Sequence, residues 1–340
     1  MEYKLRRCVW EITLACCFSC KYCGSSGGRR RDNELNTDEC LNIVGQLAAL
    51  GCRRVSLIGG EVFMRPDWDV ITESLTAHGM AVNIITNGFM FNDGLLKRLK
   101  ELRPESVSVS LDATEKIHDK YRQEGSYRRA TEALKVLGDA RIPISVISTL
   151  NSENVDCLEE LYGVLRAYPI FAWQLQACSP MGNAALNGID YRFDMGRVLD
   201  FVESKLYEAP FAVGVADNIG YYTENEGRSR GNRSGYAVFR GCGAGISSIG
   251  IDSVGNVRGC ESMYDPVFIE GNLRETTLER IWNSPEAFQY NRGFTADMLT
   301  GKCAECEMGK YCAGGCRSYN YFVHRKLYEA PFCARRLSEL

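Results

Sequence analysis

The 340-residue chain lacks three features, and each absence excludes a class of protein. It has no apolar run long enough to cross a bilayer, so we predict no contact with a membrane. Residues 1–7, MEYKLRR, contain no apolar signal core, which predicts a cytoplasmic protein. It has no basic excess either, because 40 lysines and arginines stand against 43 acidic residues. The net charge of −3 argues against a general nucleic-acid binder.

Cysteine, by contrast, is abundant, with 16 residues. In a chain without a signal sequence, so many cysteines are not read as a disulfide framework. Seven of them fall in the last hundred residues and three share one short N-terminal loop. Free cysteine otherwise behaves as a small buried hydrophobe, which is the interpretation given to Cys8, Cys40, Cys52 and Cys157.

The N-terminal loop carries Cys16, Cys20 and Cys23 in C-x3-C-x2-C spacing, directly after the extended segment 9–14. Three thiolates from one loop suit an iron–sulfur cube, which needs soft ligands and usually has four. One iron would then stay open. Cys17 is too close to Cys16 to join the same cube easily. The alternatives are buried structural cysteines or a zinc site, but zinc prefers four ligands and no fourth cysteine or histidine lies nearby at zinc-like spacing.

This spacing resembles that of the radical S-adenosylmethionine (SAM) superfamily. The resemblance implies that the amino and carboxylate groups of SAM chelate the open iron. It also implies that an electron from the cluster cleaves SAM to methionine and a 5′-deoxyadenosyl radical.

The first two-thirds of the chain alternate short apolar strands with helical stretches, the pattern of a parallel α/β sheet or barrel. Strands are predicted at 8–14, 54–58, 81–86, 106–111, 144–150 and 172–177. Helices are predicted at 37–50, 68–78, 93–102, 127–139, 154–168 and 191–207. Six units are too few for an eight-fold barrel and fit the partial (β/α)6 TIM-like barrel that the resemblance implies. We predict the barrel at 1–215, a bridge at 216–240 and a cysteine-rich extension at 241–340.

Other segments match radical SAM positions at the carboxyl ends of strands, where active sites of such sheets collect. The resemblance implies that Tyr22 packs near the adenine of SAM. It also implies that Gly59-Gly60-Glu61 holds the methionine amino group through its backbone and carboxylate. Glycines allow close backbone approach, and an anionic side chain suits an ammonium group.

Further candidate SAM contacts follow the third, fourth and sixth predicted strands. Ser110 and Asp112 are expected near the ribose and the methionine carboxylate. Arg122 or Arg128 could pair with that carboxylate, or both could belong to a solvated helix face. The remaining candidates are Thr86 and Asn87 after the third strand and Gln176 on the sixth, next to adenine.

The C-terminal cysteines occur in the order and spacing of the SPASM extension of radical SAM enzymes, which carries two auxiliary [4Fe–4S] clusters. The resemblance assigns an outer cluster to Cys303, Cys306, Cys312 and Cys333, and an inner cluster to Cys242, Cys260 and Cys316. Members with a fully ligated inner cluster have one more cysteine just upstream, and residues 234–240 contain none. The fourth inner position is therefore predicted to be open or filled by a non-cysteine ligand, with Cys178 as a less favoured alternative. A pair of zinc ribbons is the alternative for the whole region.

Two acidic residues are candidate catalytic groups. Glu261 directly follows Cys260, where some SPASM enzymes place the base that takes a proton from the substrate, although a salt-bridge or capping role is the alternative. Asp217 is a weaker candidate for substrate binding. The basic run 29–31 is either a solvated loop or a docking point for an acidic partner.

Together these features predict a SAM-dependent oxidoreductase with three [4Fe–4S] clusters that abstracts hydrogen from its substrate. The resemblance favours a ribosomally made precursor peptide, which would be crosslinked or otherwise oxidised. Reduced flavodoxin or ferredoxin is the expected electron donor. The chain begins too close to its first strand to hold a leader-recognition domain, so a separate recognition protein is one expectation. The alternatives are a dehydrogenase of a small alcohol, an enzyme side-chain maturase of the sulfatase-maturase type, and a non-catalytic iron–sulfur electron carrier.

Overall fold

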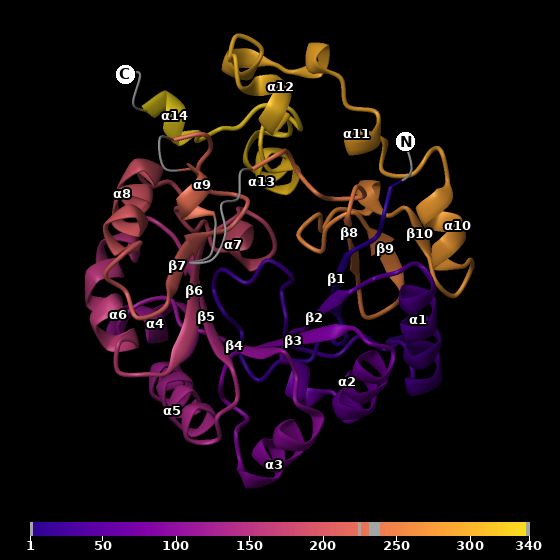
Figure 1. Ribbon diagram of the computed structural model, residues 1–340, viewed down its shortest axis with the longest axis vertical. Coiled ribbons are helices and arrows are strands. Elements are labelled where there is room, and N and C mark those ends of the chain that lie inside the picture. The colour runs from indigo at the N-terminus through magenta and orange to yellow at the C-terminus, as the bar shows by residue number, and fades with distance from the viewer. Residues whose placement is uncertain (1–2, 224–225, 231–238, 338–340) are drawn as a thin grey trace.

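The computed structural model describes residues 3–223, 226–230 and 239–337 (Figure 1). A single curved sheet organises them, with strand order β10-β9-β8-β1-β2-β3-β4-β5-β6-β7. The strands are β1 (Arg7–Glu11), β2 (Arg54–Ile58), β3 (Ala81–Thr86), β4 (Ser106–Ser110), β5 (Ile144–Leu150), β6 (Ile170–Ala177), β7 (Ala212–Val215), β8 (Ser248–Ile251), β9 (Asn256–Arg258) and β10 (Gly271–Asn272).

Helices follow the barrel strands, and the longer ones cover the outer face of the sheet, whereas the short helix 183–186 packs against the cysteine loop (Figure 1). They are α1 (Thr37–Ala49), α2 (Trp68–Ala77), α3 (Asp93–Leu102), α4 (Glu115–Tyr121), α5 (Ser126–Asp139), α6 (Leu158–Leu165), α7 (Asn183–Leu186) and α8 (Met195–Lys205). Helix α1 begins with a capping box in which Asn36 and Glu39 exchange hydrogen bonds. Its buried residues, Ile43, Val44 and Leu47 among them, pack into the main hydrophobic core.

The barrel strands divide apolar and polar residues between their two faces. In β4, Val107 and Val109 are fully buried in the core beneath the helices, whereas Ser106, Ser108 and Ser110 line a central cavity. This period-two alternation is what a strand with one face on a core requires. The interior of the partial barrel is therefore lined with hydroxyl and amide groups.

The cysteine-rich extension continues the same sheet. Strand β8 pairs in parallel with β1, with Trp10 opposite Ile251, and β9 and β10 follow in antiparallel order. The later helices are α9 (Glu226–Ser229), α10 (Leu278–Asn283), α11 (Gln289–Arg292), α12 (Gly309–Cys312), α13 (Arg317–His324) and α14 (Ala334–Leu337). The extension runs from β8 across the open side of the barrel to α14, which contacts α8 (Figure 1).

The α/β partial-barrel prediction is confirmed, with β2, β3 and β5 at the predicted bounds. Strand β7 and helix α4 were not predicted, because both are short and β7 contains a glycine. The division into three domains stays a prediction, and residues 224–225 and 231–238 of the predicted bridge lie outside the described residues. None of the described helices combines the length and the apolar character needed to cross a membrane.

Candidate active site

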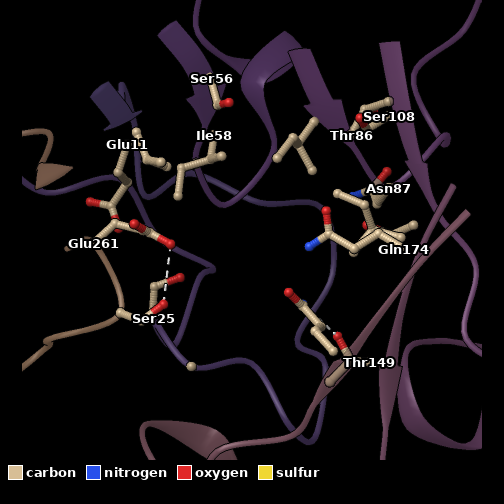
Figure 2. A pocket seen from close by; sticks show the side chains of 18 of the residues that line it. Glu11, Ser25, Ser56, Ile58, Thr86, Asn87, Ser108, Thr149, Gln174 and Glu261 are labelled. Atoms are coloured by element: carbon tan, nitrogen blue, oxygen red, sulfur yellow. Dashed lines mark hydrogen bonds between the residues drawn. The ribbon is translucent and has the colours of Figure 1, made fainter. Parts of the chain in front are cut away.

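A cavity of about 1020 Å³ fills the barrel and opens beside the N-terminal cysteine loop. Its wall comes from the inner faces of β1 to β6, from the cysteine loop and from residues 261–264 of the extension. Figure 2 shows Glu11 and Glu261 on one side of this space, with Gln174, Asn87 and Thr149 facing them from the other. Such a volume lies at the upper end of the range for pockets that hold one drug-sized ligand.

The cysteine loop is anchored at both ends of its turn. Cys16 N donates to Gly28 O at 2.8 Å, and Gly28 N donates to Leu14 O at 3.0 Å. Among the described residues, Cys16, Cys20 and Cys23 line the cavity and Cys17 does not. The three thiols thus face the space that a cluster and its ligand would share, and they are the soft donors that iron–sulfur clusters use.

Two glycines after β2 bring the loop close to the sheet. A Cβ on Gly59 would lie 2.6 Å from the carbonyl oxygen of Thr13, and a Cβ on Gly60 would lie 2.4 Å from those of Leu14 and Ala15. Gly60 N donates to Thr13 O at 2.9 Å. Both glycines line the cavity, so their bare backbone is within reach of a bound ligand.

Glu61 lies behind this wall rather than on it. The residue is 1% exposed, and its carboxylate accepts hydrogen bonds from Thr86 Oγ1 at 2.8 Å, Asn87 N at 2.8 Å and Phe63 N at 3.3 Å. Burial raises the pKa of Glu61 to about 7. The carboxylate therefore ties the end of β3 to the glycine turn. Asn87 in turn directs its amide nitrogen at the Cys17 sulfur, at 3.5 Å.

A second buried network joins Tyr22, Asp112 and Arg122. The Tyr22 hydroxyl and the Arg122 guanidinium donate to the Asp112 carboxylate, which also accepts from Thr149 N at 2.9 Å. Burial alone would raise the pKa of Asp112, but the charge and hydrogen bond of Arg122 outweigh it and lower the pKa. Tyr22 and Arg122 line the cavity with Asp112 behind them, so Arg122 already has an anionic partner.

The remaining predicted SAM contacts separate into two groups. Ser110 and Gln176 line the cavity, and Gln176 Nε2 donates to Thr149 Oγ1 at 3.0 Å. Arg128 is exposed on α5 and borders a different surface depression with Glu132 and Tyr168. The structure therefore does not bring Arg128 to the cavity, in agreement with the solvated-face alternative.

The cysteines of the extension lie in two regions, and their assignment to two clusters stays a prediction. Cys242 and Cys260 pack against the same small core. Burial raises the pKa of the Cys260 thiol, and Glu261, Cys242 and Cys316 raise it further. Burial, Cys242 and, more weakly, Asp217 raise the pKa of the Cys316 thiol. The other set forms a separate apolar cluster around Tyr221 and Leu299, and its members are Cys303, Cys312 and Cys333. Burial raises the pKa of the Cys312 thiol, and the neighbouring Cys303 and Cys306 raise it further.

Glu261 enters the cavity from the extension. Its carboxylate accepts from Cys260 Sγ at 3.3 Å and from Ser262 Oγ at 3.1 Å, and no described cation pairs with it. Asp217 follows β7 and is exposed outside the cavity lining.

Sequence reasoning missed one charged network on the cavity wall. Glu11 is 1% exposed and accepts from the Arg31 guanidinium and the Tyr264 hydroxyl, while Arg31 Nη2 donates to Tyr264 Oη at 2.6 Å. Arg29 and Arg30 pair with acidic residues of their own loop. The Arg31 side chain is 23% exposed, against 87% for Arg29 and 57% for Arg30, so Arg31 is the most buried residue of the run. Glu11 in an apolar strand was the available signal, because a buried carboxylate needs a partner.

Comparison with known proteins shows similarity to the radical SAM superfamily and to the SPASM domain. Residues 10–165 match the sequence profile of the radical SAM superfamily, and residues 242–307 match that of the SPASM iron–sulfur cluster-binding domain. The AdoMet-dependent heme synthase of Methanosarcina barkeri is 28% identical over 97% of each chain. The mycofactocin maturase MftC of Mycobacterium tuberculosis is 30% identical over 93% of this chain and 79% of its own. Streptococcus suis SuiB bound to S-adenosylmethionine has a TM-score of 0.77 at 17% identity, over 97% of this chain and 76% of that one.

Proposed function

Because the chain belongs to the radical SAM superfamily and carries a SPASM domain, we propose that it oxidatively modifies a ribosomally made peptide. Three [4Fe–4S] clusters and SAM are the proposed cofactors, and when bound they supply a 5′-deoxyadenosyl radical and a path for the electron that substrate oxidation releases. The observation that carries the proposal is a single cavity with a three-cysteine loop on one wall and Glu261 on another.

The residues around the cysteine loop fit SAM as ligand. Gly59 and Gly60 line the cavity, and their backbone carbonyl oxygens are the proposed partners of the ammonium group. Glu61 holds Asn87 and the glycine turn in place, a positioning role rather than direct contact. Tyr22 and Ser110 face the same space and are the proposed neighbours of adenine and ribose.

Glu261 is the proposed base that accepts a proton from the substrate. It is suited to this role because it lines the cavity with no described cation to neutralise it. It also directly follows Cys260, so a substrate at Glu261 would lie next to the proposed inner cluster.

The cavity favours a peptide over a heme-type macrocycle, the alternative that the heme synthase relative raises. A heme-type substrate is broad and carries carboxylates, which call for free cations. The two guanidinium groups on the described wall, those of Arg54 and Arg122, are already paired with Glu105 and Asp112. The other wall groups include hydroxyls and amides that suit peptide side chains and backbone.

The test is anaerobic incubation of reduced protein with SAM and the product of a short reading frame beside the gene. We expect 5′-deoxyadenosine together with a peptide lighter by hydrogen atoms, seen by mass spectrometry. A Glu261→Gln variant should still form 5′-deoxyadenosine but little product. Titration with heme, followed by its Soret band, tests the alternative. Stoichiometric heme binding without peptide modification would overturn the proposal.

A further inference from the structure

The proposed inner cluster has three cysteine ligands, Cys242, Cys260 and Cys316, and so one iron without a thiolate. We consider three described residues as candidates for the fourth ligand of this cluster. They are Cys178, Glu261 and Asp217. Their surroundings distinguish them.

Cys178 packs in a different side-chain cluster from the inner cysteines. Its side chain is 1% exposed and packs with Tyr22, Tyr121 and Ala184 beside the N-terminal cysteine loop. The thiol directs its proton toward its neighbour Ser179 O, at 3.9 Å. Reaching the inner cysteines would require this packed cluster to be dismantled.

Glu261 belongs to the barrel cavity. Its side chain lines that cavity, and one carboxylate oxygen accepts from Ser262 Oγ. The other oxygen lies 3.3 Å from Cys260 Sγ, which has no proton to donate once it binds iron as a thiolate. That orientation suits a group that acts on substrate.

The backbone of Asp217 is linked through the Tyr221 hydroxyl to the backbone of Cys316, an inner-cluster cysteine. The Tyr221 hydroxyl donates to Asp217 O at 2.6 Å and accepts from Cys316 N at 3.0 Å. A single phenol oxygen therefore lies between the two residues. The Asp217 carboxylate has no hydrogen bond or ion pair to any described residue, so it is available to a metal.

Tyr221 is itself held firmly. It is 3% exposed, its ring centroid lies 4.6 Å from that of Phe239, and the Arg230 guanidinium lies 5.3 Å from it. A Cβ on Gly315 would lie 2.8 Å from the ring, so this glycine lets Tyr221 approach the chain just before Cys316. The link between Asp217 and Cys316 is therefore built into packed structure.

We propose that the carboxylate of Asp217 is the fourth ligand of the inner cluster. The proposal rests on the cluster assignment made above. A carboxylate carries the same charge as the thiolate that it replaces, so the cluster keeps the charge of a four-cysteine site. It also closes the open iron of the inner cluster, which makes this cluster an electron relay rather than an anchor for substrate.

The test uses full-length protein in which the other open iron has been removed. Replacing the three N-terminal loop cysteines by alanine leaves two auxiliary clusters in this parent. The probe is ¹³C-cyanide, a small ligand for open iron, added to the reduced, reconstituted protein. Its ¹³C hyperfine coupling is measured by electron–nuclear double resonance, and iron is determined for every sample.

We expect no coupling in the parent and a clear coupling after Asp217→Ala. Asp217→Cys should show no coupling, should keep the full iron content and should shift the g values. The matched control is Glu261→Gln, which removes the rival carboxylate and should behave as the parent does.

Coupling in the parent itself, or in Glu261→Gln alone, would overturn the proposal. If Asp217→Ala loses about half of the iron, retention of all of it by Asp217→Cys supports the proposal, and loss in both overturns it. A parent with iron for only one auxiliary cluster would overturn the cluster assignment as well, and iron analysis makes that failure recognisable.

Discussion

Replacing Asp112 by asparagine should destabilise the protein by about 3 kcal/mol, at the lower end of the cost of breaking a buried ion pair. The Asp112 side chain is 2% exposed and that of Arg122 is 10% exposed, so water cannot replace the lost charge. Asparagine keeps an acceptor for Thr149 N, which lies 2.9 Å from Asp112 Oδ1. Its amide NH2 would face the Arg122 guanidinium, and two donors would then meet without an acceptor.

The assay is thermal unfolding of reconstituted protein with equal iron content. At 2–4 °C per kcal/mol for large domains, the expected fall in melting temperature is about 6–12 °C. The control is Glu105→Gln, which breaks the Arg54–Glu105 pair. That pair is also closely spaced, at 2.6 Å, but its side chains are 48% and 38% exposed. An exposed pair contributes about 0–1 kcal/mol, so the control should hardly shift the melting temperature.

The pH dependence follows from the lowered pKa of Asp112. A carboxyl group whose pKa is lower in the folded state stabilises the fold above its unfolded value of about 3.9. That contribution is lost as the pH falls through the pKa of the folded state. The difference in melting temperature between wild type and Asp112→Asn should therefore narrow below about pH 4. Equal shifts for Asp112→Asn and Glu105→Gln at neutral pH would refute the burial argument.

Three further predictions concern the cysteine loop. Joint replacement of Cys16, Cys20 and Cys23 by alanine should leave roughly two-thirds of the iron, because each of the three proposed [4Fe–4S] clusters would carry equal iron, and should abolish 5′-deoxyadenosine formation. Cys17→Ala should keep both iron and SAM cleavage, and loss of one cluster's iron would contradict this. Gly60→Ala should disrupt the loop and lower the iron content, because its Cβ would meet two carbonyl oxygens at 2.4 Å, whereas Gly163→Ala on α6 meets nothing within 4 Å and should be harmless.

Local signals were sufficient to predict strands β1 to β6 and the position of the cysteine loop after the first of them. Period-two alternation and the cysteine spacing are both short-range patterns. Because the carboxyl ends of parallel strands meet at one edge of the sheet, Gly60 and Ser110 are then expected at one cavity, and both line it. The orientation of charged groups was not predictable in this way. Glu61 was expected to contact SAM, yet it hydrogen-bonds to the end of β3. Arg122 or Arg128 was expected to pair with the SAM carboxylate or to lie on a solvated helix face, and Arg122 lines the cavity while paired with Asp112. A buried charge takes whichever partner the tertiary fold supplies.

The contact between the extension and the cavity was likewise not predictable from local sequence patterns. Within the segment 248–251, SIGI, Gly250 would be taken for a weak point in a strand. In the sheet it pairs with Val9 of β1, and a Cβ there would lie 2.3 Å from Glu261 N. The missing side chain therefore leaves room for the backbone of Cys260 and Glu261 to pack against β8, and Glu261 lines the cavity there. Because the β1–β8 register fixes the position of Gly250, it also fixes the place of Cys260 relative to the loop that follows β1. The distance between the two proposed redox centres is thus set by strand pairing, a long-range property that no local pattern encodes.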